Sequence, residues 1–182
     1  MKFNKNRLLK LLKESKKRQE EGKSYSDYMN DELLSYLIMI EDQFFWESKK
    51  EYIWLLDLFV NKKISVDQFL DQFYTLRGSN LHSARMFTEK LEKEPFSEIN
   101  IQFNPKSYGF TDLISDFHSV TDVYNPDVSL KMNLKYPDLV FYGMSKEYLI
   151  LEIEEYFLPQ LKKYLSWNGV CYGCNWESTY FF

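Results

Sequence analysis

Residues 47–77, ESKKEYIWLLDLFVNKKISVDQFLDQFYTLR, decide the fold of this chain. The first half places large apolar side chains at the spacing of one helical face, at Tyr52, Leu55, Leu56 and Phe59. Only Asp57 is polar between Tyr52 and Val60, so we expect this helix to be buried on more than one side. The stretch therefore begins with a core helix.

A short turn and a second helix follow. Asn61-Lys62-Lys63 is expected to end the first helix, because a turn-forming residue precedes two cations at the carbonyl end. Ser65 and Gln68 have the S-x-x-Q spacing of a capping box, which predicts the start of the next helix. Its apolar face consists of Val66, Phe69, Leu70, Phe73 and Leu76. The pattern predicts a helical hairpin with an aromatic core, which ends at the breaker Arg77-Gly78-Ser79-Asn80.

The rest of the chain also reads as helical. We expect a helix from a cap at Ser26 or Asp27, a break near residues 43–48, and a helix over residues 81–93. A short helix is predicted from Thr111 to Phe117, followed by a long loop at residues 121–144 that packs Tyr124, Leu134, Tyr136 and Phe141. A final helix is predicted to start at Ser145, to bury Leu149, Ile153, Tyr156, Phe157 and Leu161, and to kink or restart at Pro159.

These elements predict an all-α protein with one domain, an antiparallel helical bundle over residues 24–166. Residues 1–23 form an N-terminal basic helical extension, and residues 167–182 form an aromatic C-terminal tail. The extension suits a membrane surface or RNA, or it is a solvated helix docked through its leucines, which we favour. Its few apolar residues predict that the body folds without it. The tail either folds back on the bundle or docks on a partner.

Residues 52–76, YIWLLDLFVNKKISVDQFLDQFYTL, resemble the opening of the colicin D immunity and related bacterial self-protective colicin-like immunity family. Residues 113–127 are similar to its helix followed by an Asp, aromatic, Pro, Asp segment, and residues 147–165 to its last amphipathic helix. The resemblance spans roughly residues 47–166. It implies a non-enzymatic protein whose acidic face binds a basic nuclease active site in place of the RNA substrate.

Composition and charge narrow the function. The chain has 182 residues and a net charge of −4, but residues 1–23 carry +6 and the remainder −10. An acidic body argues against direct nucleic-acid binding and allows contact with a basic protein. Ala84 is the only alanine while Lys, Asn, Phe and Tyr abound, which indicates an AT-rich genome. With neither a membrane-spanning run nor a signal peptide expected, we predict a cytoplasmic protein, or a stromal or matrix protein if it is organelle-encoded.

Candidate catalytic and metal-binding residues are few. Cys171 and Cys174 form a C-x-x-C that is read as half of a zinc site, as a redox dithiol, or as reduced structural cysteines, the last being favoured. His118 lies near Asp116 and Asp122 in sequence, where a general base is conceivable, yet no catalytic motif accompanies it. We expect no enzyme activity and no cofactor.

The candidate partner-binding residues are acidic or aromatic. They are Asp116, Asp122, Asp127, Glu152 and Glu155, together with Trp167 and Trp176 of the tail. Carboxylates opposite Lys and Arg steer association and occupy phosphate-binding groups. The leading hypothesis is a protein-binding module for a basic partner such as a ribonuclease toxin. The alternative is a small structural or assembly subunit of a larger complex, docked by its basic arm and aromatic tail.

Overall fold

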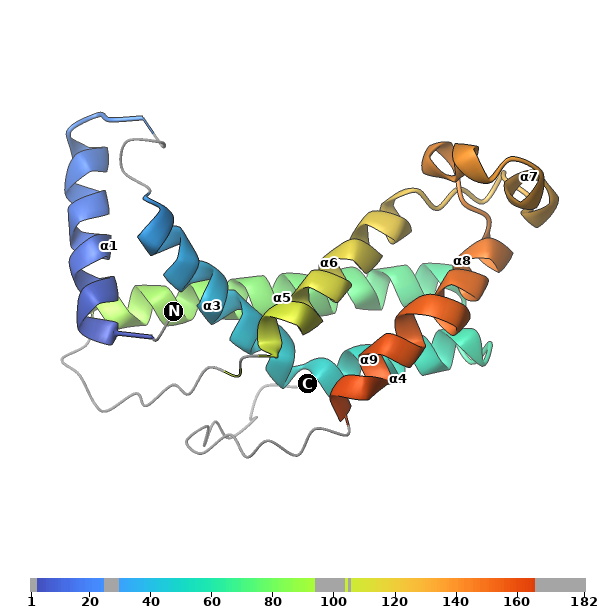
Figure 1. Cartoon of the computed structure of the whole chain (residues 1–182), viewed down its shortest axis with the longest axis horizontal. Coiled ribbons are helices and arrows are strands. Elements are labelled where there is room, and N and C mark those ends of the chain that lie inside the picture. The colour runs from blue at the N-terminus through green and yellow to red at the C-terminus, as the bar shows by residue number, and fades with distance from the viewer. Residues whose placement is uncertain (1–2, 25–29, 94–103, 105, 166–182) are drawn as a thin grey trace.

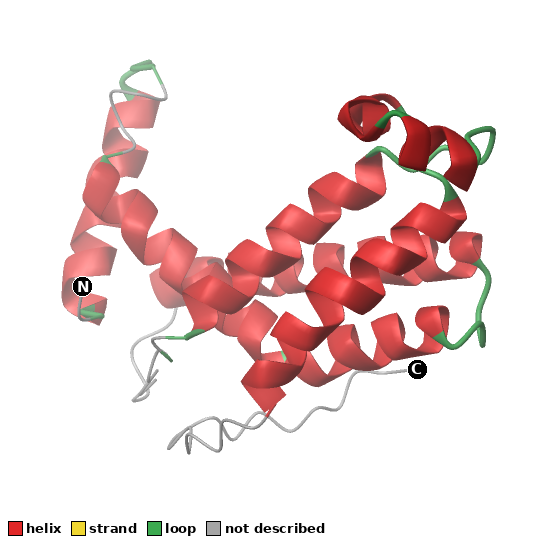
Figure 2. Ribbon diagram, turned by 45° about the vertical axis from the view of Figure 1, so that its right-hand side comes forward, coloured by secondary structure: helices red, strands yellow, loops and turns green. Residues whose placement is uncertain are grey.

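The computed structural model describes residues 3–24, 30–93, 104 and 106–165, and these are helical with no strand among them. Figure 2 shows the arrangement of the helices. The helices are α1 (Lys5–Glu20), α3 (Asp31–Glu47), α4 (Lys49–Val60), α5 (Val66–Lys93), α6 (Ser107–Asp122), α7 (Leu130–Lys135), α8 (Lys146–Glu152) and α9 (Leu158–Leu165). A 3-10 helix, η1 (Pro137–Tyr142), follows α7, and a π-helical turn, η2 (Ile153–Phe157), joins α8 to α9. The predicted all-α bundle is confirmed.

The long helix α5 is the axis of the molecule (Figure 1). Its 28 residues span about 42 Å at a rise of about 1.5 Å per residue. The first half packs with α4, α6 and α9 in the larger core, and the second half packs with α1 and α3 in a smaller one. The break predicted at residues 77–80 is wrong, because the helix continues through Gly78 and keeps burying side chains at Ala84, Phe87 and Leu91.

The predicted hairpin is confirmed in detail. Helix α4 ends at Val60, and Lys62 adopts a left-handed conformation with φ 58°. The Lys62 and Lys63 amides donate to the carbonyls of Phe59 and Leu58, both at 2.9 Å, which is the Schellman pattern of a helix end. Ser65 and Gln68 form the expected reciprocal capping box, with bonds of 3.2 Å and 2.9 Å.

Stacked and edge-on aromatic rings fill the larger core. The rings of Phe59 and Phe69 stack with centroids 4.4 Å apart, while Phe73 and Phe117 meet edge to face at 5.0 Å. We expected α4 to be buried on more than one side. Trp54 is an exception, because it is 60% exposed. The buried face of α4 is broad, but it stops short of Trp54.

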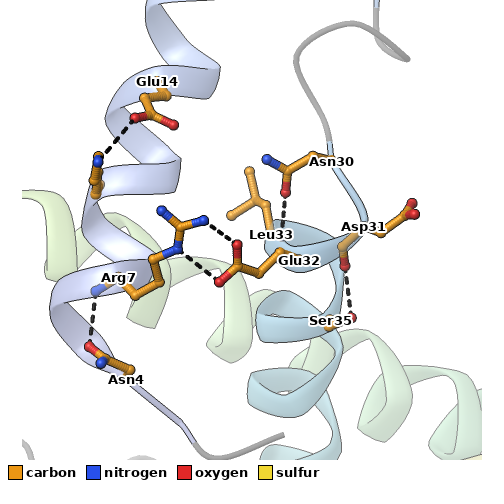
Figure 3. A network of polar contacts seen from close by, with 9 residues as sticks. Asn4, Arg7, Glu14, Asn30, Asp31, Glu32, Leu33 and Ser35 are labelled. Atoms are coloured by element: carbon orange, nitrogen blue, oxygen red, sulfur yellow. Dashed lines mark hydrogen bonds and ion pairs between the residues drawn. The ribbon is translucent and has the colours of Figure 1, made fainter.

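The smaller core explains where α1 docks. Leu8 and Leu11 are buried against α3 and α5, as expected for a helix docked through its leucines. Figure 3 shows the polar contacts beside this packing, where the Arg7 guanidinium forms a bidentate pair with the Glu32 carboxylate. Asn4 caps α1 and Asn30 caps α3, the latter accepting from the Leu33 amide at 2.7 Å. The cap of α3 is thus Asn30; the candidates Ser26 and Asp27 lie outside the described residues.

The last helical stretch, α8–η2–α9, is built around a four-residue repeat. Leu149, Ile153, Phe157 and Leu161 are all buried. Such a repeat drifts by about 40° per step around a helix of about 3.6 residues per turn. The π turn widens the helix in the middle of this row, and the Leu158 amide bonds to the Ile153 carbonyl five residues back. The wider turn keeps the row facing the core and lets the helix continue through Pro159.

Three further expectations need correction. The region at 121–144 is not a long loop, because it contains α7 and η1, and Leu134 and Tyr136 are exposed rather than packed. Helix α6 begins at Ser107, four residues before the predicted cap Thr111, and extends to Asp122. Tyr156, predicted to be in the core, is 49% exposed. The expected break between α3 and α4 is confirmed at Ser48.

Helices α6 and α9 run antiparallel along one side of the larger core. The start of α6 meets the end of α9 where Gly109 approaches Tyr164, and the Phe117 ring meets the Phe157 ring further along. Among the described residues, no helix is both long enough and apolar enough to cross a bilayer.

Candidate partner-binding surface

The predicted acidic residues do not form one face. Asp116 and Asp122 are six residues apart on α6, so their side chains leave the helix about 120° from each other. Asp122 points toward α5, where its carboxylate accepts a hydrogen bond of 2.8 Å from the Tyr74 hydroxyl. Asp116 is exposed elsewhere on α6. These two residues of the resembling segment 113–127 therefore have different surroundings.

His118 is part of the Asp122 environment. Its Nδ1 lies 3.5 Å from the second Asp122 oxygen, and its ring lies edge-on to Tyr74 with centroids 5.5 Å apart. Thr121 lies beside the Tyr74 hydroxyl at 3.3 Å. Of the two neighbouring carboxylates predicted for His118, the structure brings Asp122 to it. This polar group links α5 to α6 at the edge of the larger core.

Glu152 and Glu155 do share one surface. Both line a groove of about 550 Å³ between α7 and the α8–η2 turn. Its remaining lining consists of Leu134, Tyr148, Leu151 and Tyr156. Tyr156 and Leu134 are 49% and 63% exposed, so apolar surface and carboxylates stand side by side at the groove. We call these six residues the α7–α8 groove.

Buried polar contacts position α7 against α8. The buried Asn133 side chain donates to the Gly143 carbonyl and accepts from the Ser145 amide, both at 2.9 Å. Ser145 in turn caps α8 through the Tyr148 amide at 3.1 Å. Because Asn133 is fixed in the interior, its neighbour Leu134 is held outward beside Tyr148 and Glu152.

Backbone hydrogen bonds also fix the segment between α6 and α8 at its two ends. The Met144 amide donates to the Val123 carbonyl at 2.7 Å, and the Asn125 amide donates to the Met144 carbonyl at 2.8 Å. A Cβ at Gly143 would lie 2.9 Å from a Val128 methyl group, so this position has no room for a side chain. The segment between α6 and α8 is thereby a structured arm that carries one wall of the groove.

The electrostatics of the groove follow from its two carboxylates. Burial raises the pKa of Tyr148, and the negative charges of Glu152 and Glu155 raise that pKa further. Both glutamates therefore act on the same point in the groove. No lysine or arginine is among the lining residues. The groove accordingly offers a negative potential beside aromatic and aliphatic surface, which suits a cationic group on an apolar stem.

Sequence reasoning missed the apolar half of the groove. Leu134 and Tyr156 were expected in the core, yet both are exposed and line the groove. The missed signal was Ser129, which caps α7 through the Met132 amide. A helix starting there puts Asn133 inward and its neighbours outward.

The remaining candidates lie apart from the groove. Asp127 is exposed in a turn, where its amide donates to Asn125 Oδ1 at 2.9 Å. Trp167, Trp176, Cys171 and Cys174 lie outside the described residues. Within the part of the chain that is described, no three His, Cys, Asp or Glu side chains gather as metal ligands.

A second groove, of about 440 Å³, lies between α4 and α5 beside the exposed Trp54. Leu55 and Leu76 contribute apolar surface, and Glu51 and Asp71 contribute two carboxylates. It lies on the α4–α5 hairpin. Its indole makes it a further candidate contact surface that the sequence did not indicate.

Comparison with protein-family models, with curated protein sequences and with solved structures finds no match for this chain.

Proposed function

We propose that this protein is a non-enzymatic binding module that holds a basic protein partner against the α7–α8 groove. The observation that carries the proposal is that Glu152 and Glu155 line one groove with the exposed side chains of Leu134 and Tyr156. Interfaces combine such apolar contact area with charges that set orientation and association rate. The acidic balance of residues 24–182 supports a basic partner.

The class of partner comes from the resemblance to colicin-like immunity proteins. A ribonuclease toxin binds RNA phosphates with Lys and Arg, and carboxylates at an inhibitor surface occupy the same cations. The hairpin that carries the resemblance forms the centre of the larger core. In this proposal the hairpin is part of the core that holds the helices in place, and the acidic groove contacts the partner.

The competing hypothesis is a structural subunit docked by the basic arm and the aromatic tail. Leu8 and Leu11, the apolar anchors of α1, are buried within the chain itself. The fully exposed residues of that helix are mostly charged, and exposed ion pairs contribute little on average. This observation favours the binding module over the subunit.

The test measures RNA cleavage by purified ribonuclease domains of colicin-like toxins, with and without the full chain. We expect one domain to be inhibited at equal stoichiometry and to form a complex that weakens with salt. Inhibition of none of the domains, together with constitutive co-purification of the chain with a large assembly, would support the structural subunit and overturn the proposal.

A variant of the groove and a variant outside it locate the contact. Reversing Glu152 and Glu155 to lysine changes the groove, and Asp116→Lys changes an exposed carboxylate on α6 outside it. We expect the groove reversal to abolish inhibition and Asp116→Lys to reduce it only slightly. Asp122 is left unchanged in both, because its reversal would also break the hydrogen bond from Tyr74.

A further inference from the structure

We infer that the α7–α8 groove is a recognition site for one arginine side chain of the partner protein. The inference rests on the proposed function and makes it more specific, since it assigns the groove a single cationic residue rather than a general positive surface. Three features of the groove carry it: paired carboxylates, a ring left half-exposed, and an aliphatic wall.

The two carboxylates are three residues apart on one side of the helix and line the same groove. Glu152 and Glu155 flank the boundary between α8 and the π turn, and both line the same groove. Tyr148 lines the groove together with both glutamates. An arginine has five N–H donors in a planar fork, which match two acceptor carboxylates better than the compact ammonium of lysine does.

The exposed ring gives the cation a stacking surface. Tyr156 lines the groove with half of its surface exposed, and its ring lies edge-on to the buried Phe157 at 4.9 Å. That contact with a core residue fixes the ring. Guanidinium planes stack on aromatic faces, and arginine does so more often than lysine. The ring therefore favours arginine over lysine for a second, independent reason.

The aliphatic wall fits the stem of the side chain. Leu134 projects from α7 and Leu151 from α8, so apolar surface lies opposite and beside the carboxylates. An arginine buries its methylene stem along such surface while its charged end reaches polar partners. The groove has a volume of about 550 Å³, which is enough for one long side chain, and no lysine or arginine lines it.

The neighbouring Glu154 provides the matched control. It lies between the two groove carboxylates in sequence, is exposed, and is not among the groove-lining residues. Glu154→Gln removes the same unit of charge from the same turn. If a long-range field attracts the arginine, all three Gln variants should weaken its binding alike. If the groove is a recognition site, only Glu152→Gln and Glu155→Gln should weaken it.

The experiment titrates the full chain with acetyl-arginine amide and follows backbone amide signals by two-dimensional NMR. Acetyl-lysine amide and acetyl-norleucine amide are the comparison probes. We expect saturable shifts at the groove residues with the arginine probe, binding about tenfold weaker with lysine, and none with norleucine. Glu152→Gln or Glu155→Gln should weaken arginine binding about tenfold, while Glu154→Gln leaves it unchanged.

The inference is overturned if the arginine probe produces no localised shifts in the groove. It is equally overturned if lysine binds as tightly, or if Glu154→Gln weakens binding as much as Glu155→Gln. A well-dispersed spectrum for each variant shows that it is folded. Because no partner protein is present, this test is independent of the proposed function: arginine binding without any inhibited toxin leaves the site standing, and an inhibited toxin without arginine binding leaves only the function.

Discussion

The Asn80 side-chain amide Nδ2 donates a hydrogen bond of 3.1 Å to the Tyr52 hydroxyl inside the protein, and the side-chain oxygen Oδ1 of Asn80 accepts one of 2.8 Å from the Ser48 hydroxyl. Tyr52 and Asn80 are 1% and 6% exposed. One buried amide on α5 therefore ties together α4 and the junction between α3 and α4. Asn80 is therefore a buried contact within α5 and not a helix breaker.

Asn80→Ala should lower the free energy of unfolding by about 1–3 kcal/mol, because it leaves the Tyr52 hydroxyl buried without this partner. Tyr52→Phe in the same chain should recover part of that loss, since removing both partners of a buried hydrogen bond is far less costly. Urea unfolding of the two single variants and the double variant measures the coupling. Strictly additive losses would show that the bond contributes nothing.

The aromatic core should be intolerant of truncation. Phe69 and Phe73 are fully buried among Phe59 and Phe117, so Phe69→Ala or Phe73→Ala should cost about 3–5 kcal/mol. Trp54→Ala is the matched control on the same hairpin, and its exposed side chain predicts a loss below about 1 kcal/mol. Equal losses for all three variants in chemical denaturation would contradict the assignment of the core.

Asp42 should make stability depend on pH. It is buried on α3, and burial raises its pKa from 3.8 to about 6, with the charges of Glu41 and Asp112 acting in the same direction and a hydrogen bond from Thr111 opposing it. Because the folded-state pKa of Asp42 lies above its unfolded-state value, the protonated Asp42 stabilises the folded protein. This contribution is complete below about pH 4 and is lost as the pH rises through about 6.

Asp42→Asn removes that titration while keeping the shape of the side chain. We expect the variant to be more stable than wild type by about 1–3 kcal/mol at about pH 8, and equal to it near pH 4. Denaturation at both pH values measures the difference, and Asp116→Asn serves as the exposed control. A gain that is the same at both pH values would rule out Asp42 as its source.

Removing residues 1–23 should open the smaller core and spare the larger one. The deletion exposes Leu33, Tyr36 and Phe87, which pack against Leu8 and Leu11. Amide hydrogen exchange should accelerate at residues 33–40 and 84–91 and stay slow at residues 52–59 and 69–73. Loss of the cooperative unfolding transition would show instead that the two cores form a single unit.

Local chemistry explains which parts of the fold were predictable. The Ser65–Gln68 capping box and the turn at Lys62 act within a few residues, so their sequence signals are nearly complete. Asn80 looked like part of a breaker because its decisive partner, Tyr52, is far away in sequence. The π turn before Pro159 likewise could not be predicted locally, because it depends on the burial of Leu149, Ile153, Phe157 and Leu161 in the core.

The candidate surface was predictable in part. The three-residue spacing of Glu152 and Glu155 placed both on one side of the last helix, and they line one groove. The link to Asp116 and Asp122 failed because the helix was predicted to end at Phe117, so the direction of Asp122 on α6 could not be derived. The apolar wall could not be predicted, since it depends on Asn133 being held by Gly143 and Ser145 across the arm.

The most direct test of the binding surface uses the basic partner that the wild-type chain retains in affinity purification from its native cell. The quantity measured is the rate at which this partner associates with the chain. The rate is measured at low and at high salt for wild type, for the Glu152→Lys and Glu155→Lys double variant, and for Asp116→Lys. We predict that the double reversal slows association by at least about tenfold at low salt and removes most of its salt dependence, while Asp116→Lys does neither. A double reversal that associates as fast as wild type at low salt would contradict the account and move the contact to the groove beside Trp54 or to the aromatic tail.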